Sequence, residues 1–470
     1  MHLRVALDDR KHVTKSSLIM KRDFTKGPIT ASLLRLAIPI IAANIFHTVY
    51  QLTDTFWVGQ LGKQAVAAVS LSFPILFLLI QFGIGLTVAG SILVAQYKGQ
   101  RKQGKIDYYA AQTLSLMVIV SLVFAYIGFV SSDFFINLMN PEPSVAQDAV
   151  QYLQISFIGF TFMAVFFVYQ SVVRGVGDVK TPLYIVIGTV LLNFFLDPLF
   201  ILGWGAMPAF GVAGAALATV VTQSLSAIIG VILLLSGTRG VHLKPRHLLP
   251  RFITIKKLFL LGFPTSIEGS SRALSMVVMT FITSVFGTLA IASYGLGSRI
   301  FSFIIVPTIG LAMSTSTIVG QNIGAGKIDR ARATMKKSMK IGFWALTIIG
   351  IILFIFAEQV VGAFVPGEVD VIRESTLFIR ITSLTYGFVG MQMGAIGTLR
   401  GSGNTRSAMT LSILTIIIMV STGYTLSHLT PLGMQGIWWA YAISNITGAL
   451  LALMYITFSS WEKTRVIDHG

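Results

Sequence analysis

Two aspartates lie in stretches of the chain that are long and apolar enough to cross a membrane. Asp54 lies within residues 36–59, and Asp197 lies within residues 181–205. An ionised side chain at the centre of a spanning helix costs roughly 2.5–3.5 kcal/mol on insertion scales. The two acids therefore indicate a site for a cation, a proton or a substrate. The alternative is that each carboxyl group is neutral, or is satisfied by the helices around it.

Each aspartate has a polar neighbour one helical turn earlier, on the same face of its predicted helix. Tyr50 precedes Asp54, and Asn193 precedes Asp197. A hydroxyl and an amide beside two carboxyl groups could hold Na⁺ through oxygen ligands, or could share a proton. Desolvation and crowding favour the neutral form of a carboxyl group. The residues therefore predict ion coupling, and they leave H⁺ and Na⁺ both open.

A second charged set lies in the later half of the chain. Glu268 and Arg272 are one turn apart in residues 257–283. The simplest interpretation is a structural pair whose charges neutralise each other, and the alternative is a second substrate or coupling site. Arg380 is expected to reach toward the outer interface.

Nucleotide, metal and enzymatic chemistry find little support in the residues. The sequence GQRKQGKI (residues 99–106) fits the phosphate-loop spacing, but Ile106 stands where Ser or Thr would bind magnesium. The seven histidines form no ligand cluster, and the chain has no cysteine. We expect no cofactor and no enzymatic activity.

The composition is that of an integral membrane protein. The 470 residues are 54% hydrophobic and 11% charged, and the mean hydropathy is +0.78. A spanning helix needs about 20 predominantly apolar residues. Windows of that size predict an all-α protein with twelve spans, near residues 33–57, 66–94, 108–130, 147–172, 182–203, 211–235, 257–283, 288–317, 338–361, 374–398, 407–428 and 434–458.

The net charge of +17 comes from basic residues in alternate connections between the predicted spans. The N-terminal arm and residues 236–257 are basic, whereas residues 131–148 and 203–211 have no Lys or Arg. Because basic connections remain in the cytoplasm, both termini are predicted to be cytoplasmic. This placement argues against a nucleic-acid partner and predicts a multi-pass protein of the inner membrane.

The chain repeats itself with an offset near 225 residues. Pro39 matches Pro264, and both prolines fall inside predicted spans, where they act as hinges or as static kinks. Met279 and Gly423 stand at the positions equivalent to Asp54 and Asp197, so the scaffold does not require an acid there. The repeat predicts two parallel six-helix lobes related by a pseudo-twofold axis along the membrane normal, with a cavity between them. The predicted regions are a basic cytoplasmic arm (1–30), an N-lobe (31–235), a cytoplasmic linker (236–257), a C-lobe (258–459) and a cytoplasmic tail (460–470).

Over about residues 25–460 the sequence resembles the multidrug and toxin extrusion (MATE) transporters. The resemblance rests on the twelve-span plan and on four segments: DTFWVGQLG, RGVGDVKTP, NFFLDPLFI and GVAGAALATVVTQ. Asp54, Asp197 and Asn193 resemble the N-lobe acidic site of the DNA-damage-inducible branch and its archaeal relatives. By the same resemblance Thr219 joins the ion site, and Tyr50, Tyr152 and Gln170 shape the substrate cavity.

The resemblance implies a monomeric secondary antiporter. It would export organic, cationic or amphipathic compounds through the lipid bilayer in exchange for H⁺ or Na⁺. Sodium, if it is the coupling ion, would bind at Asp54, Asn193, Asp197 and Thr219. The second reading is a flippase of lipid-linked oligosaccharides or cell-wall precursors from the same superfamily.

Overall fold

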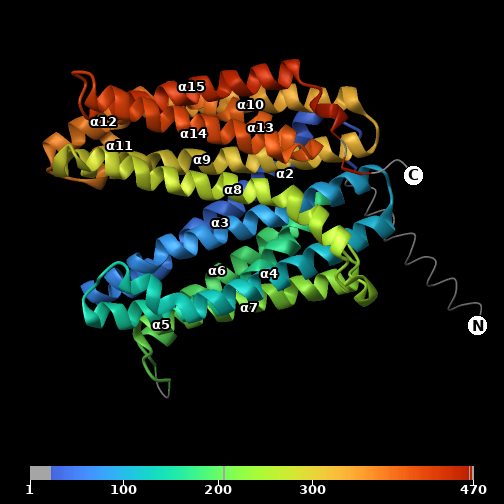
Figure 1. Cartoon of the computed structure of the whole chain (residues 1–470), viewed down its shortest axis with the longest axis horizontal. Coiled ribbons are helices and arrows are strands. Elements are labelled where there is room, and N and C mark those ends of the chain that lie inside the picture. Colours follow the sequence, from blue (N-terminus) through green and yellow to red (C-terminus); the bar gives the residue numbers. More distant parts are fainter. Residues whose placement is uncertain (1–22, 205–206, 465, 468–470) are drawn as a thin grey trace, which may run out of the picture. The chain divides into compact units, whose positions relative to one another are not determined.

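The computed structural model describes residues 23–204, 207–464 and 466–467, so most of the predicted N-terminal arm lies outside the described residues. Within them the chain forms α-helices and two short 3₁₀ helices and no β-strand, which confirms the all-α prediction (Figure 1). The first half contains α2 (Ile29–Gly59), α3 (Lys63–Gly99), α4 (Gln103–Asn137), α5 (Pro143–Gly175), α6 (Lys180–Ile201) and α7 (Gly211–Ser236).

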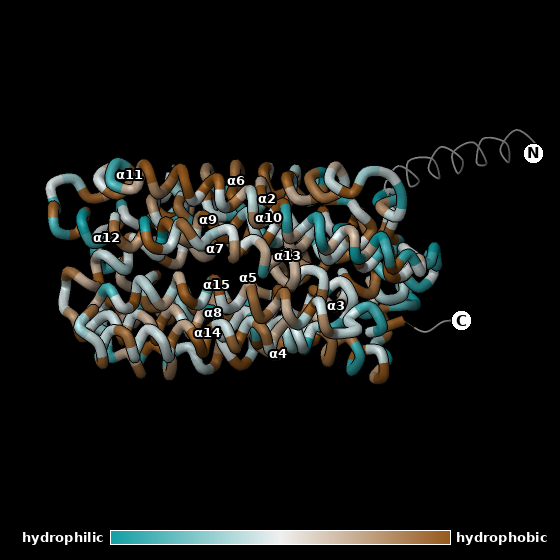
Figure 2. The backbone as a smooth tube through the Cα atoms, turned by 90° about the horizontal axis from the view of Figure 1, so that it is seen from above, coloured by the Kyte–Doolittle hydropathy of each residue, from teal (hydrophilic) through white to brown (hydrophobic). Residues whose placement is uncertain are grey.

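The second half repeats this order, but two of its helices are each divided into two segments. It contains η1 (Pro245–His247), α8 (Phe252–Ser284), α9 (Gly287–Gly324), α10 (Ile328–Ile355), α11 (Ala357–Phe364), α12 (Val369–Ser383), α13 (Tyr386–Ser402), α14 (Thr405–His428), α15 (Gln435–Phe458) and η2 (Trp461–Lys463). The divided helices are α10 with α11 and α12 with α13. Figure 2 shows hydrophilic residues gathered near many of the helix ends, as expected for helices whose middle parts face lipid.

Among the described residues, ten helices are long and apolar enough to cross a membrane. The other two predicted spans correspond to α8 and to the pair α12 and α13. Helix α8 carries Glu268 and Arg272 within its length, which lowers its hydropathy. Helices α12 and α13 are each shorter than a bilayer requires, because the chain breaks between Ser383 and Tyr386.

The break between α12 and α13 is held by polar side chains. The Thr385 hydroxyl donates to the Thr382 carbonyl at 2.6 Å, and it accepts a hydrogen bond from the Asn445 amide of α15 at 3.0 Å. Irregular backbone at membrane depth is tolerated where it is buried in protein and its polar groups have partners. The hydropathy of residues 374–398 gave no sign of this break.

The described chain divides into two compact units, and the division passes through α2 and α8. The first unit contains residues 42–266, and the second contains residues 27–41 and 267–470. Both boundaries fall two residues after a proline inside a helix, Pro39 in α2 and Pro264 in α8. The first part of α2 therefore belongs to the second unit and the rest of α2 to the first. For α8 the order is reversed: its first part belongs to the first unit and its remainder to the second.

Two glycines explain how the first parts of α2 and α8 pack. In the first unit, a Cβ at Gly85 of α3 would lie 2.3 Å from the backbone N and Cα of Ser266. In the second unit, a Cβ at Gly310 of α9 would lie 2.5 Å from Cγ1 of Ile41. Both helix pairs therefore approach closely at a glycine. The two contacts are equivalent under the 225-residue offset, so the structure supports the predicted repeat at the level of packing.

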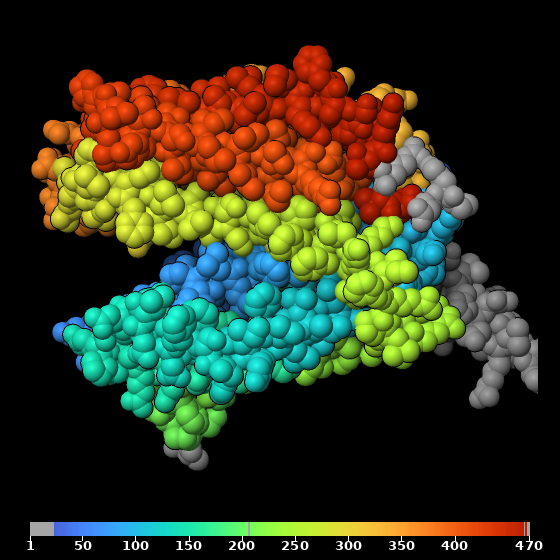
Figure 3. Space-filling model, in the orientation of Figure 1, coloured from blue at the N-terminus to red at the C-terminus, as the bar shows by residue number. Residues whose placement is uncertain are grey.

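The linker after α7 is ordered and lies against α4 (Figure 3). The Gln112 side-chain amide donates to the carbonyls of His247 and Leu249 at 2.6 and 2.8 Å, and its oxygen accepts from the Arg251 N–H at 2.9 Å. The Asp107 carboxylate accepts from the His242 N–H at 3.0 Å. These bonds fix the connection instead of leaving it a free tether.

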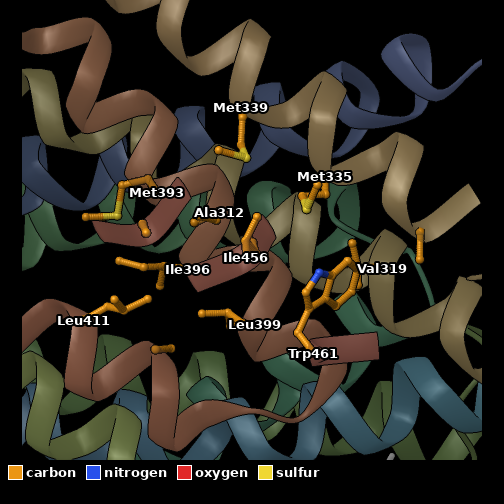
Figure 4. Packing of buried hydrophobic residues seen from close by; sticks show 14 of the residues in the cluster. Ala312, Val319, Met335, Met339, Met393, Ile396, Leu399, Leu411, Ile456 and Trp461 are labelled. Carbon is orange, nitrogen blue, oxygen red and sulfur yellow. The ribbon is translucent and has the colours of Figure 1, made fainter. Parts of the chain in front are cut away.

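A methionine-rich apolar cluster holds one end of the second unit together. Met335 and Met339 of α10 pack with Met393 of α13 and with Ile456 of α15 (Figure 4). Trp461 of η2 belongs to the same cluster and is only 2% exposed. The start of the predicted C-terminal tail is therefore anchored by burial of a large aromatic ring.

Candidate functional site

Asp54 lies in the last two turns of α2 with its side chain buried. It is 9% exposed, and its Oδ1 atom has no hydrogen-bond partner among the described residues. No Lys or Arg of the described chain forms an ion pair with it, although burial of an unpaired carboxylate is costly. Asp54 Oδ1 is therefore a buried hydrogen-bond acceptor that a proton or a cation could occupy.

Asp197 and Asn193 form a hydrogen-bonded pair on α6. The Asn193 Nδ2 donates to Asp197 Oδ1 at 2.8 Å, and both residues are fully buried. Asp197 Oδ2 and Asn193 Oδ1 have no partner among the described residues. Pro198 follows directly and lacks an N–H, so one carbonyl of the preceding turn loses its helix partner. The pair thus offers two more open oxygen atoms.

Asp54 and Asp197 lie close enough for their charges to interact. Together with Asn193 they present three buried oxygen atoms that have no hydrogen-bond partner among the described residues: Asp54 Oδ1, Asp197 Oδ2 and Asn193 Oδ1. A proton on one carboxyl group would supply one donor to these atoms, and a Na⁺ ion could take them as oxygen ligands. These oxygen atoms are suitable for binding either H⁺ or Na⁺.

Tyr50 joins α2 to α7 beside this pair. Its hydroxyl lies 3.1 Å from Thr222 Oγ1, and both residues are buried. Thr222 Oγ1 also lies 3.1 and 2.9 Å from the carbonyls of Ala218 and Thr219, so its own proton has acceptors on its helix. We therefore assign Tyr50 as the donor. The sequence singled out Thr219, which also lies near the Tyr50 hydroxyl, and missed Thr222 one turn later on the same face.

Of the two remaining cavity residues, the structure brings one to this cluster. Tyr152 of α5 is 9% exposed and interacts electrostatically with Tyr50, Asp54 and Asp197. Gln170 lies eighteen residues further along the same helix, which corresponds to about 27 Å of helix rise. Gln170 therefore lies far from the acids, toward the opposite end of α5.

Aromatic rings lie on the same helices as the two acids. Trp57, one turn after Asp54, meets Phe194 of α6 edge to face, with ring centroids 6.1 Å apart. His47 stacks on Tyr50 at 6.1 Å. Trp57 and Phe194 were absent from the predicted site, although each lies three residues from an acid and so shares its helix face.

The equivalent positions of the second unit are also neighbours, but they are apolar. Met279 packs over Gly423, where a Cβ would lie 3.1 Å from the methionine methyl carbon. Met279 is fully buried in a cluster with Tyr294, Phe378 and Trp438. The scaffold thus juxtaposes these two positions twice, and only the first unit fills them with acids. The acidic character of the site in the first unit therefore comes from Asp54 and Asp197 themselves and not from the fold that both units share.

Glu268 of α8 is held by more partners than the sequence indicated. Its carboxylate accepts from Arg400 Nη2 at 2.7 Å and from the Ser412 hydroxyl at 2.8 Å, and Arg272 lies 3.5 Å away. Because Arg400 and Ser412 each donate to one of its oxygens, both oxygens of Glu268 already have a partner.

Arg272 lines a cavity of about 140 Å³ in the second unit, together with Gln392, Thr415 and Asn445.

A test of the Tyr50 contact follows from this geometry. We expect Tyr50→Phe and Thr222→Val each to weaken the apparent affinity for the coupling ion by roughly three- to tenfold, because each removes one buried hydrogen bond. The double variant should be no weaker than Tyr50→Phe alone, since loss of the Tyr50 hydroxyl already removes its bond to Thr222. The measurement is ion-driven efflux against ion concentration, with Thr222→Ser as the control that keeps the hydroxyl. Additive losses would contradict the contact.

The MatE family model matches residues 39–199 and 264–425. The two matched stretches begin at Pro39 and Pro264, the equivalent prolines of the repeat. The chain is 30% identical to a probable multidrug resistance protein, YoeA, of Bacillus subtilis, covering 96% of this chain and 98% of that protein. It is 25% identical to a probable multidrug resistance protein, NorM, of Thermotoga maritima, covering 93% and 94%. A solved structure of a MATE protein in a bent conformation is 25% identical, with a TM-score of 0.87 over 94% of this chain and 98% of that one.

Proposed function

This chain belongs to the MatE family of multidrug transporters, and from that premise we propose that it is an antiporter that exports organic compounds in exchange for H⁺ or Na⁺ bound at Asp54 and Asp197. It is a multi-pass membrane transporter and not an enzyme. The observation that carries the proposal is the set of three buried oxygen atoms, one on each acid and one on Asn193, for which the described part of the chain supplies no donor.

Coupling follows from the chemistry of these atoms. When both carboxyl groups are ionised, the site holds two negative charges without a cationic partner, so it attracts a proton, a sodium ion or the positive group of a substrate. Once the coupling ion is bound, the charge that attracts a cationic substrate is reduced. Each binding event thus disfavours the other, as antiport requires.

The remaining residues have supporting roles in this proposal. Tyr50, Thr219 and Thr222 orient the acids from α2 and α7, and Tyr152 and Gln170 line the path of the substrate at different depths of α5. The hinge in this proposal is Pro39 of α2 or Pro198 of α6, where the hydrogen bond that proline cannot donate makes bending of the helix less costly. The cavity beside Arg272 is a secondary candidate for part of the substrate.

Efflux from proteoliposomes, with a proton gradient and a sodium gradient imposed separately, tests the function. We expect a cationic dye to leave against its own gradient when one of the two ion gradients is present. An identical rate with no ion gradient, or after an ionophore has collapsed the gradient that supports efflux, would contradict antiport. A protein that moves lipid-linked sugars but no dye would favour the flippase instead.

The topology also belongs to the proposal. We infer that the protein lies in the inner membrane as a monomer with both termini in the cytoplasm, since the basic connections fall on that side. The chain has no cysteine, so single cysteines at Ser144, Thr238 and Ser460, which are all exposed, report sidedness directly. Only the cysteine at position 144 should react with an impermeant reagent added outside intact cells. Outside labelling at position 238 would overturn this topology.

A further inference from the structure

A groove between α6 and α7 remains outside the site described above. It has a volume of about 610 Å³ and lies in the first unit. The residues that line it come from the first half of α6, the second half of α7 and the turn that follows, and include Lys180, Tyr184, Gly188, Leu225, Ile229 and Arg239. Because Tyr184 is 67% exposed, the groove opens on the outer surface of these two helices.

The charges of the groove are concentrated at one end. Lys180 begins α6, and Arg239 follows the end of α7, so both lie where the two helices meet the same membrane surface. Neither residue forms an ion pair within the described part of the chain, and the Arg239 Nε atom is buried there without a hydrogen-bond partner. The lining contains no Asp or Glu. This end therefore carries two positive charges and an unused donor.

The neighbouring acid forms no ion pair with Lys180 or Arg239 in the described part of the chain. Asp178 lies two residues before Lys180, but its carboxylate accepts from the Thr181 N–H at 3.2 Å and from the Thr181 hydroxyl at 2.7 Å. Asp178 is 1% exposed, and its side chain accepts these hydrogen bonds from the first turn of α6. Lys180 and Arg239 remain available to an outside ligand.

The rest of the groove is mainly apolar, and its one hydroxyl on the middle of α6, Thr189, donates to the backbone of its own helix. Leu225 and Ile229 form one wall, and Gly188 leaves the opposite side open, since a Cβ there would meet no atom within 4 Å. A groove with a basic end and an apolar length is complementary to a lipid that has an anionic headgroup and an acyl chain. The basic end lies on the side we propose to be cytoplasmic, where anionic lipids are found.

We propose that this groove binds one anionic phospholipid of the cytoplasmic leaflet. Lys180 and Arg239 hold its phosphate, and an acyl chain lies along Leu225, Ile229 and Gly188. Gly188 is about 7.5 Å of helix rise from Asn193, so the lipid fills the surface of the helix that carries part of the ion site.

Native mass spectrometry of the purified full-length protein tests the proposal. The probes are phosphatidylglycerol and phosphatidylcholine with the same acyl chains. We expect the first bound phosphatidylglycerol to be favoured over phosphatidylcholine by about tenfold or more, because two basic residues contact the headgroup. The preference should disappear in the Lys180→Gln/Arg239→Gln variant. Gly188→Leu should displace the lipid without disturbing the fold, since space is open at that position.

Matched controls separate this groove from general surface charge. Lys336→Gln/Lys337→Gln removes the same charge from an exposed part of α10, and Gly295→Leu adds the same side chain to α9 at another glycine with open space. Both should keep the wild-type preference. Equal loss in the two charge variants would overturn the proposal, and so would equal binding of the two lipids by the wild type. Competition by inorganic phosphate without any lipid preference would also overturn it.

Discussion

Asp197→Asn is expected to reduce ion-driven efflux by at least about tenfold, and Asp54→Asn by a similar factor, because each removes a charge-assisted interaction with the coupling ion. Both substitutions keep the volume of the side chain and remove only its ionisation. In Asp197→Asn the remaining amide oxygen can still accept the Asn193 hydrogen bond, so the helix face should be preserved. The measurement is dye efflux from proteoliposomes under the gradient that drives the wild type.

Two comparisons sharpen this result. Asp133→Asn makes the same chemical change at an exposed position on α4 and should leave efflux unchanged. Met279→Asp places an acid at the equivalent position of the second unit and should not rescue Asp54→Asn, because the neighbours of Met279 are the aromatic residues Tyr294, Phe378 and Trp438 and the position facing it is Gly423, so no second carboxyl group is available to share an ion. Full gradient-driven transport by both single Asn variants would refute the coupling role of the acids.

Gly85→Ala is expected to destabilise the protein by about 1–3 kcal/mol and to impair transport, since its Cβ would overlap the backbone of Ser266. A backbone atom cannot rotate away, so α3 and α8 would have to separate. Gly310→Ala should cost less, because the atom it meets is Cγ1 of the Ile41 side chain, which can move. Thermal unfolding of the purified variants, measured together with efflux, checks both effects.

Second substitutions distinguish these two contacts. Ile41→Ala should rescue Gly310→Ala, because it removes the overlapping atom. Ser266→Gly should not rescue Gly85→Ala, because the overlapping N and Cα atoms remain. Gly295→Ala, at a glycine with no atom within 4 Å, is the control and should behave as the wild type. Wild-type stability of Gly85→Ala would show that the close approach of α3 and α8 is not required.

The sequence predicted the parts of the fold that depend on hydropathy and on repetition. Runs of apolar residues located the helices. The sequence placed the two lobes at residues 31–235 and 258–459, whereas the compact units divide α2 and α8 two residues after Pro39 and Pro264, which hydropathy does not indicate. The break between α12 and α13 was missed because a window average smooths over a short polar stretch. Its cause is tertiary, since Asn445 of a distant helix holds Thr385.

The candidate site was predictable where residue type was informative by itself. A buried acid is rare enough in an apolar stretch to stand out, and its neighbour one turn away follows from helix geometry. Thr222 was missed because many threonines in such helices only bond their own backbone, and the contact with Tyr50 depends on how α2 meets α7. Arg400 follows the predicted span at residues 374–398, and its pairing with Glu268, 132 residues earlier, depends on how α8 meets α13.

The most direct test of the account is equilibrium binding of a transported cationic dye, measured from acidic to mildly alkaline pH, with and without sodium. Coupling at Asp54 and Asp197 predicts that wild-type affinity rises as the coupling ion is withdrawn, because the ion and the dye compete for the same buried charge. Asp54→Asn should lose most of that dependence, whereas Asp133→Asn should keep it. Wild-type affinity that is independent of both pH and sodium would contradict direct competition at these carboxyl groups.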